Sequence, residues 1–349
     1  MFPDATNIFV VGRPRSGTTL IVRLFDSHPE FLTINSETIF YVRAEQLKSI
    51  SNPEQKFLHL TGRPYDNNNK RPQDFANDIE PNQNWDQHKF YTDLLTYHPN
   101  PERCREQLFA IASAGPKAAL QAVFALSEEA FPSDHRTRFL VEKTPEHEYH
   151  IERIRRDFPN SIFIHMIRDP FDVIASRSKG FKKRNYVQET LNWRHSIKIF
   201  VENKKKFPDR HFAIRFEDLT RHPQATMEKL AKLLDFNFSE VLLTPTDLRG
   251  RQKWKSHTHQ ANAPRDGVVD ANLTHRNIEE DLKIDDIRTI GSWLGRAYSA
   301  CGFERHKRYM KQFPPVFPPN MNKKYLLYLF ARRVLIADFL YFRSRSQLI

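Results

Sequence analysis

Residues 7–19 read NIFVVGRPRSGTT, and this stretch decides the fold. The first six residues, Asn7–Gly12, form a short apolar run that ends in glycine, and such a run predicts a buried strand. After Gly17, apolar side chains recur at helical spacing, which predicts a helix over residues 18–27. A strand, a tight loop and a helix in this order predict the start of an α/β domain with an anion-binding loop.

The loop Gly12–Thr19 (GRPRSGTT) has the composition of a phosphate-binding loop. Two glycines let backbone N–H groups converge on an anion, and the N-terminus of the next helix adds partial positive charge. The spacing follows the pattern G-x(4)-G-K-[ST], but Thr18 stands where that pattern has lysine. A nucleoside triphosphatase needs this lysine, so we expect phosphate binding without ordinary ATP hydrolysis. Arg15, inside the loop, is the cation nearest to the missing lysine. The alternative to a phosphate-binding loop is a turn between two glycines that binds no ligand.

Strands and helices alternate again from about residue 138. Apolar runs predict strands over 138–142, 161–167 and 211–216, and helices over 146–158, 169–178, 186–206 and 224–234. This alternation predicts a P-loop-containing three-layer α/β fold, with a central, mainly parallel sheet flanked by helices. The pattern is looser between about residues 44 and 131, where helices on both sides of Gly115-Pro116 are expected. We therefore expect a main domain over residues 1–310 with a helical, acceptor-binding insertion at about 44–131, and a helical extension over 311–349.

A second candidate anion site follows the strand over 161–167. That strand ends in Arg168-Asp169-Pro170, so it delivers an arginine to the sheet edge where ligands of open α/β sheets bind. Ser176 follows two helical turns later, and an arginine fork and a hydroxyl can bind one phosphate together. Asp169 is expected to cap the helix, and no metal site is expected. Two phosphate sites favour a nucleotide with phosphates at both ends of its ribose. The alternative role for Arg168 is an ion pair at the protein surface.

These motifs resemble those of a known family. Gly12–Thr19 resembles the 5′-phosphosulfate loop of the sulfotransferases that use 3′-phosphoadenosine-5′-phosphosulfate (PAPS), and Arg168–Ser176 (RDPFDVIAS) resembles their 3′-phosphate motif. Phe216–Leu219 (FEDL) resembles a further segment of that family, and the resemblance covers most of residues 7–236. It implies PAPS as the sulfuryl donor and no metal. The residues implied to hold the phosphosulfate are Arg15, Ser16, Gly17, Thr18 and Thr19, and those for the 3′-phosphate are Arg168 and Ser176.

The resemblance also implies residues for the chemistry. The segment through Ser36-Glu37-Thr38 resembles protein-tyrosine sulfotransferases, in which a glutamate before a threonine is the general base, so this role falls on Glu37. Lys143 corresponds to a lysine that contacts the bridging oxygen and the transferred sulfonate, with Arg15 assisting from the loop. The implied reaction is in-line transfer to a hydroxyl or an amine. An acid at a helix start and a solvated surface lysine are the alternatives for these two positions.

The net charge of +12 favours anionic partners, which include nucleic acid, an acidic membrane and a phosphorylated small molecule. A module that binds nucleic acid leaves the paired phosphate motifs unexplained, so no nucleic-acid partner is expected. A P-loop small-molecule kinase and a catalytically silent nucleotide-binding relative stay open. The acceptor stays open among a carbohydrate, a lipid-linked glycan, a small molecule and a peptide tyrosine. The basic loop Arg249–Trp254 either closes over the nucleotide or is an ordinary surface loop.

The sequence also bears on location. No signal peptide and no uncharged apolar run long enough to span a membrane are recognised, so a cytoplasmic location is expected. The segment over residues 323–343 is rich in Leu, Tyr and Phe and is interrupted by charged residues. It either packs on the domain, which is slightly favoured, or lies on an acidic membrane surface. Cys104 and Cys301 are too few for a disulfide framework or a four-cysteine zinc site.

Overall fold

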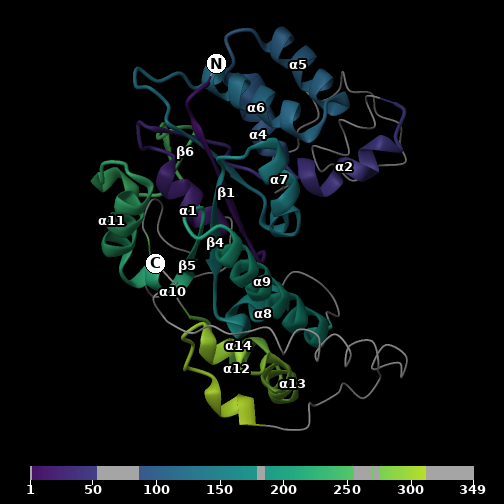
Figure 1. Cartoon of the computed structure of the whole chain (residues 1–349), viewed down its shortest axis with the longest axis vertical. Coiled ribbons are helices and arrows are strands. Elements are labelled where there is room, and N and C mark those ends of the chain that lie inside the picture. The colour runs from purple at the N-terminus through teal and green to yellow at the C-terminus, as the bar shows by residue number, and fades with distance from the viewer. Residues whose placement is uncertain (1, 53–85, 179–184, 255–268, 270–274, 312–349) are drawn as a thin grey trace. The chain divides into compact units, whose positions relative to one another are not determined.

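The computed structural model describes residues 2–52, 86–178, 185–254, 269 and 275–311 (Figure 1). Its main sheet has five strands in the order β2-β3-β1-β4-β5, which are β1 (Thr6–Gly12), β2 (Phe31–Thr33), β3 (Phe139–Lys143), β4 (Ile162–Ile167) and β5 (His211–Arg215). The β1–β3 and β2–β3 pairs are parallel. The predicted α/β class with a mainly parallel sheet flanked by helices is confirmed.

The helices that follow these strands lie close to their predicted positions. They are α1 (Thr18–Phe25), α7 (Ile151–Asp157), α8 (Pro170–Ser178), α9 (Tyr186–Lys206) and α11 (Pro223–Leu234), whereas α10 (Phe216–Arg221) was not predicted and begins at the last residue of the strand expected over 211–216. The prediction for residues 186–206 is confirmed to the residue, and the side chain of Asn185 caps α9 by accepting from Gln188 N at 3.1 Å. The segment predicted as one helix over 146–158 instead begins with a 3₁₀ helix, Pro145–His150, which places His147 in the core.

The described part of the looser region is helical. It contains α2 (Phe40–Lys48), α4 (Asp86–Tyr97), α5 (Pro101–Ser113) and α6 (Pro116–Ala130). Proline occupies the first position of both α5 and α6, where its missing N–H costs little, and the expected break at Gly115-Pro116 is confirmed. Residues 53–85 of the expected insertion lie outside the described residues.

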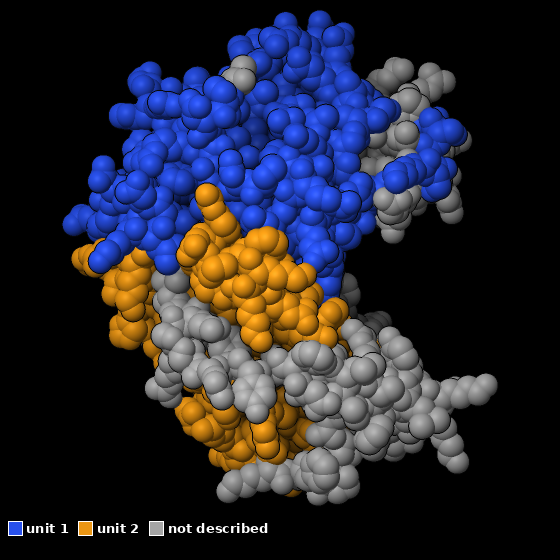
Figure 2. Space-filling view, in the orientation of Figure 1, with its two compact units in different colours: residues 1–11, 18–163, 231–269 blue, residues 12–17, 164–230, 270–349 orange. Residues whose placement is uncertain are grey.

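The chain divides into two compact units (Figure 2). Unit 1 comprises residues 1–11, 18–163 and 231–269, and unit 2 comprises residues 12–17, 164–230 and 270–349. In unit 1, Phe31 stacks on Phe25 and on Phe139 with ring centroids 4.7 Å apart in both pairs. In unit 2, Trp193 and Phe200 of α9 belong to one buried apolar cluster with residues of α13. The remaining elements are η3 (Glu240–Leu243), β6 (Thr246–Asp247), β7 (Gln252–Lys253), α12 (Ile278–Asp281), α13 (Ile284–Leu294), α14 (Ala297–Ala300) and η5 (Lys307–Lys311).

Both cysteines are buried and free. Cys104 lies on α5 in unit 1, and burial raises the pKa of its thiol to about 11. Cys301 follows α14 in unit 2, and burial likewise raises its pKa. Neither thiol is therefore a reactive thiolate at neutral pH.

No helix in the described ranges is both long enough and apolar enough to cross a membrane. Residues 312–349 lie outside the described residues, and this segment includes almost all of the predicted C-terminal extension. The boundary of the C-terminal extension therefore stays a prediction, and so does its packing on the domain or on a membrane. The domain over residues 1–310 likewise stays a prediction.

Candidate functional site

The loop between β1 and α1 has a backbone that only glycine can adopt at two positions. Gly12 has φ +130° and Gly17 has φ +90°. A Cβ atom at Gly12 would overlap the backbone oxygen of Met166, and one at Gly17 would overlap the ring of Phe216. Both a positive φ and a close approach therefore require these glycines. Arg15 also has a positive φ, +77°, so the loop is tightly curled as the sequence predicts.

The side chains of the loop and of the second anchor meet within unit 2. Arg15 Nε donates to Ser176 Oγ at 2.9 Å, and Arg168 Nη1 donates to the backbone oxygen of Arg15 at 3.3 Å. Ser16 Oγ is buried and has no hydrogen-bond partner among the described residues. A buried hydroxyl normally finds a partner, so its position is suited to an oxygen of a bound phosphate. Five predicted ligands are thereby brought together: Arg15, Ser16, Gly17, Arg168 and Ser176.

Two of the three residues predicted for the chemistry, Glu37 and Lys143, meet within unit 1, whereas Arg15 belongs to unit 2. In the parallel β2–β3 pair Thr33 lies opposite Val141, so the segments that follow both strands leave the sheet at the same edge. Lys143 ends β3, and its Nζ donates to Glu37 Oε1 at 3.0 Å. The lysine side chain is 2% exposed and the glutamate side chain 36%. A buried cation beside a carboxylate that solvent can reach is an arrangement able to serve proton transfer and charge neutralisation.

A profile of the sulfotransferase family matches residues 7–240. The chain belongs to the sulfotransferase family. It is 24% identical over 301 residues to the protein-tyrosine sulfotransferase of Drosophila melanogaster, and the match covers 83% of this chain and 47% of that protein. It is 23% identical over 151 residues to the omega-hydroxy-beta-dihydromenaquinone-9 sulfotransferase of Mycobacterium bovis, with 39% of each chain covered.

The sulfotransferase domain of the Synechococcus PCC 7002 olefin synthase is a similar solved structure. Its TM-score is 0.49 at 17% identity, over 97% of this chain and 98% of that domain. The present chain spans about half the length of the Drosophila relative.

Arg168 of this sulfotransferase-family chain is a partly desolvated cation. Its side chain packs on Phe216, with the guanidinium carbon 4.1 Å from the ring centroid, and its backbone oxygen accepts from Trp193 Nε1 at 3.0 Å. Burial lowers the pKa of the guanidinium, while the carboxylates of Asp172 and Glu217 act in the opposite direction. Arginine keeps its proton at ordinary pH, so the buried guanidinium stays charged although it has lost part of its hydration. A bound anion would stabilise this charge.

Asp169 acts as the helix cap that the sequence predicts. Its Oδ1 accepts from Phe171 N at 2.9 Å in the first turn of α8, and its Oδ2 accepts from the hydroxyl of Tyr298 at 2.9 Å. Its own N–H donates to Glu217 at 2.8 Å. Burial raises the pKa of Asp169, and the nearby charges of Asp172 and Glu217 raise it further. Both oxygens of Asp169 thus accept hydrogen bonds that fix the start of α8.

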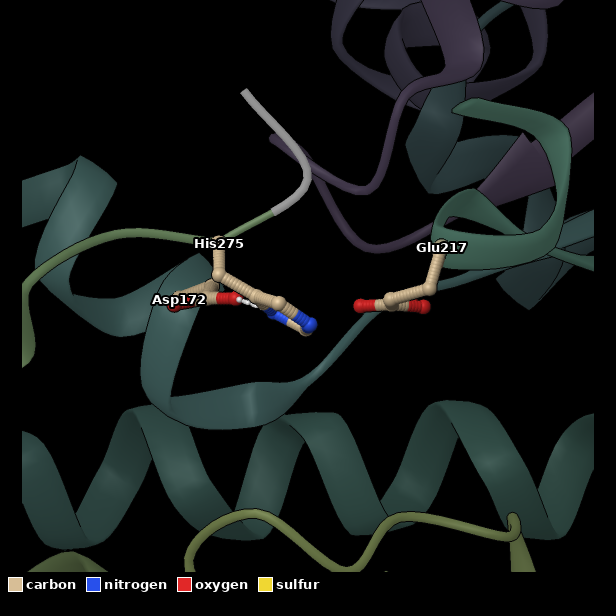
Figure 3. A group of neighbouring side chains, drawn as sticks. All are labelled: Asp172, Glu217 and His275. Atoms are coloured by element: carbon tan, nitrogen blue, oxygen red, sulfur yellow. Dashed lines mark hydrogen bonds and ion pairs between the residues drawn. The ribbon is translucent and has the colours of Figure 1, made fainter. Parts of the chain in front are cut away.

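Asp172, Glu217 and His275 form the group drawn in Figure 3, whose candidate ligand atoms lie within 4.8 Å of one another. Both ring nitrogens of His275 are already engaged, because Nδ1 lies 3.1 Å from Asp172 Oδ2 and Nε2 contacts the guanidinium of Arg221. Asp172 Oδ1 also accepts from Arg276 N at 3.1 Å. A cation would have to displace one of these partners, so we assign no metal to this group. Sequence reasoning did not single out Asp172 or His275.

Glu142, the residue before Lys143, is a buried carboxylate with four donors. Its Oε1 accepts from the hydroxyls of Thr38 and Thr144 at 2.8 and 2.6 Å and from Thr38 N at 3.4 Å, and its Oε2 lies 2.9 Å from His147 Nδ1. Burial acts to raise the pKa of Glu142, but His147 and the hydroxyl donors outweigh burial and hold it below its usual value. Sequence reasoning missed this network, and the only signal was a charged residue inside a buried strand.

The Glu142→Gln variant is expected to lower the free energy of unfolding by about 2 kcal/mol at neutral pH, because the neutral amide leaves buried donors poorly satisfied. The folded-state pKa of Glu142 lies below the ordinary value of 4.5. Its stabilisation is therefore fully present above about pH 4.5 and is lost as the pH falls through the lower folded value. Urea unfolding of both proteins between about pH 7 and 3 measures the difference, which should stay constant down to about pH 4.5 and shrink below it. The exposed Glu202→Gln is the control, and a difference that grows with acid would contradict this assignment.

The basic loop after β6 packs within unit 1. Arg249 donates to Glu128 at 2.9 Å and to the backbone oxygen of Phe131 at 2.7 Å, and Arg251 donates to the backbone oxygen of Ala130 at 3.1 Å. These bonds hold the C-terminal end of α6 and favour a structural role for the loop. Thr18 and Thr19 occupy the first two positions of α1, directly after the loop, and their phosphate contacts stay predictions.

Proposed function

We propose that this chain transfers a sulfuryl group from PAPS to a hydroxyl group. The observation that carries the proposal is the contact between the two predicted phosphate anchors, in which Arg15 binds Ser176 and Arg168 binds the backbone of Arg15. A nucleotide with a phosphate at each end of its ribose can engage both anchors. Membership of the sulfotransferase family supports the same donor, as does the buried hydroxyl of Ser16, which has no hydrogen-bond partner in the described part of the chain.

The proposal assigns each predicted residue a role. The phosphosulfate is held by Arg15, Ser16, Gly17, Thr18 and Thr19, and the 3′-phosphate by Arg168 and Ser176. The acceptor oxygen forms a bond to sulfur as the bond between sulfur and the bridging phosphate oxygen breaks. Glu37 takes the proton of the acceptor hydroxyl, and Lys143, with Arg15, neutralises the charge that develops on the departing bisphosphate. The products are a sulfate ester, 3′-phosphoadenosine-5′-phosphate (PAP) and the proton.

The acceptor is proposed only as a hydroxyl compound. One relative is named for protein tyrosine and another for an omega-hydroxy menaquinone, and both names describe hydroxyl acceptors. A peptide tyrosine, a carbohydrate, a lipid-linked glycan and a small alcohol are therefore the classes for an acceptor screen. A cytoplasmic location and a membrane contact of the C-terminal segment stay predictions.

Calorimetric titration with PAP, in the presence of a chelator, tests the nucleotide site. We expect PAP to bind without a metal and Mg·ATP to bind far more weakly, because the loop lacks the lysine that a triphosphatase uses. Binding of Mg·ATP with no response to PAP would overturn the proposal and favour a kinase. A positive result justifies a screen of acceptors with sulfur-35-labelled PAPS.

A further inference from the structure

The region around Glu37 and Lys143 contains a buried carboxylate that the proposed reaction does not use. Glu142 is 1% exposed, and one of its oxygens binds the residue after Glu37 as well as the residue after Lys143. The hydroxyl of Thr144 in turn accepts from Ile39 N at 3.1 Å. The carboxylate of Glu142 and the hydroxyl of Thr144 therefore join the segment over residues 37–39 to the end of β3.

This junction continues the strand pairing beyond its last backbone bond. β2 has only three residues, its ladder with β3 ends at Thr33, and Ile34 N donates the next bond to Val141 O at 2.8 Å. Farther along, the side chains of Glu142, Thr144 and Lys143 make hydrogen bonds between the segment over 37–39 and the end of β3. The position of Glu37 thus depends on side-chain bonds to Glu142 and Thr144.

His147 fixes the other oxygen of Glu142. Its ring is fully buried, lies 5.4 Å from the ring of Tyr41 in a T-shaped contact, and directs Nδ1 at Glu142. His147 Nε2 is buried and has no hydrogen-bond partner among the described residues. A carboxylate oxygen only accepts, so Nδ1 is the donor in the 2.9 Å contact with Glu142 Oε2.

We propose that Glu142, held by His147, is a positioning residue that sets the geometry of Glu37 and Lys143 through Thr38 and Thr144. The roles of Glu37 and Lys143 in the reaction rest on the proposed function. The placement of these two side chains does not, because it follows from the hydrogen bonds alone. We call the set Thr38, Glu142, Thr144 and His147 the carboxylate clamp.

The Thr38→Val variant tests the clamp because it removes one hydroxyl with little change in shape. Its first readout is the rate at which acetic anhydride acetylates Lys143, followed by mass spectrometry of the full chain. Lys143 is protected by burial and by Glu37, and loss of one bond to a charged group is expected to raise its acetylation roughly tenfold. Thr38→Ser, which keeps the hydroxyl, should restore protection.

A matched control exists in the same unit. Thr33 is also buried, but its hydroxyl bonds to Asp26 at 2.7 Å and to Asn35 at 2.9 Å and not to a residue of the clamp. Thr33→Val should therefore leave acetylation of Lys143 unchanged. Equal acetylation of Lys143 in wild type and Thr38→Val would overturn the proposal, and so would an equal rise in Thr33→Val.

Turnover gives the second readout, with labelled PAPS and a tyrosine peptide as the probes. We expect Thr38→Val to lower kcat roughly 10- to 100-fold with little change in KM for PAPS. If Thr38 acts through Glu37, the double variant Glu37→Gln/Thr38→Val will be no slower than Glu37→Gln, whereas additive losses would overturn a positioning role. If the wild type fails to bind PAP, the proposed function is contradicted. The acetylation result would still show whether the clamp positions Lys143.

Discussion

Glu37→Gln is expected to slow sulfuryl transfer by roughly 10²- to 10⁴-fold, which is the usual contribution of a positioned general base. The amide cannot take the proton of the acceptor hydroxyl as it attacks sulfur. Binding of PAP should persist and should be at least as tight as in wild type, since the variant removes a negative charge and releases Lys143 from its ion pair. Transfer of sulfur-35 from PAPS to the acceptor measures the first effect, and calorimetry with PAP measures the second.

Glu102→Gln is the matched control for this variant. Glu102 is an exposed acid in the first turn of α5, also in unit 1, so its loss removes the same charge away from Lys143. It should keep full activity. Undiminished transfer by Glu37→Gln would show that Glu37 is not the general base. Loss of both PAP binding and activity would indicate that Glu37 helps to bind the nucleotide instead.

Arg168→Ala is expected to weaken PAP binding by roughly 30- to 1,000-fold, equivalent to about 2–4 kcal/mol, as expected for loss of a buried cation that binds an anion. The guanidinium is 4.1 Å from the Phe216 ring and bonds to the loop backbone, so its direction is fixed before any ligand arrives. Calorimetry with PAP measures the change. Thermal unfolding of the variant shows whether the domain stays folded.

Arg288→Ala removes the same charge without touching the loop. Arg288 is exposed and pairs with Asp285 one turn away on α13, so its loss should leave PAP affinity within about twofold, as is usual for an exposed ion pair. Similar losses in both variants would reduce the role of Arg168 to general attraction of anions. Unchanged binding in Arg168→Ala would remove it from the 3′-phosphate site.

Much of the fold could be predicted because its elements carry local signals. Buried strands such as β1 and β4 are mostly apolar, and α9 has a cap at Asn185 and a basic end, so each is visible within a few residues. The start of the helix predicted over 146–158 was predicted less well. It is a 3₁₀ helix in which His147 is buried and contacts the ring of Tyr41, which is distant in the chain, and local propensity carries no trace of such a contact.

The site divides in the same way. The loop, Arg168 and Ser176 follow from short motifs with fixed spacing, and the structure brings them together. The clamp joins residues 104 positions apart, Thr38 and Glu142, and no spacing rule connects them. The group around Asp172 and His275 likewise depends on tertiary contact, over 103 positions. Sequence can thus name the residues that touch a ligand more readily than those that hold them in place.

The two buried cysteines provide a pair of internal reporters for unfolding. A buried thiol reacts with an alkylating reagent only when its surroundings open, and Cys104 and Cys301 lie in different units. Mass spectrometry of peptides from the alkylated wild-type protein gives the labelling rate of each cysteine separately. Each rate measures the local opening of one unit. A nucleotide that stabilises unit 2 alone would slow alkylation of Cys301 and leave that of Cys104 unchanged, so the two thiols can assign the stabilising effect of any ligand to one half of the chain.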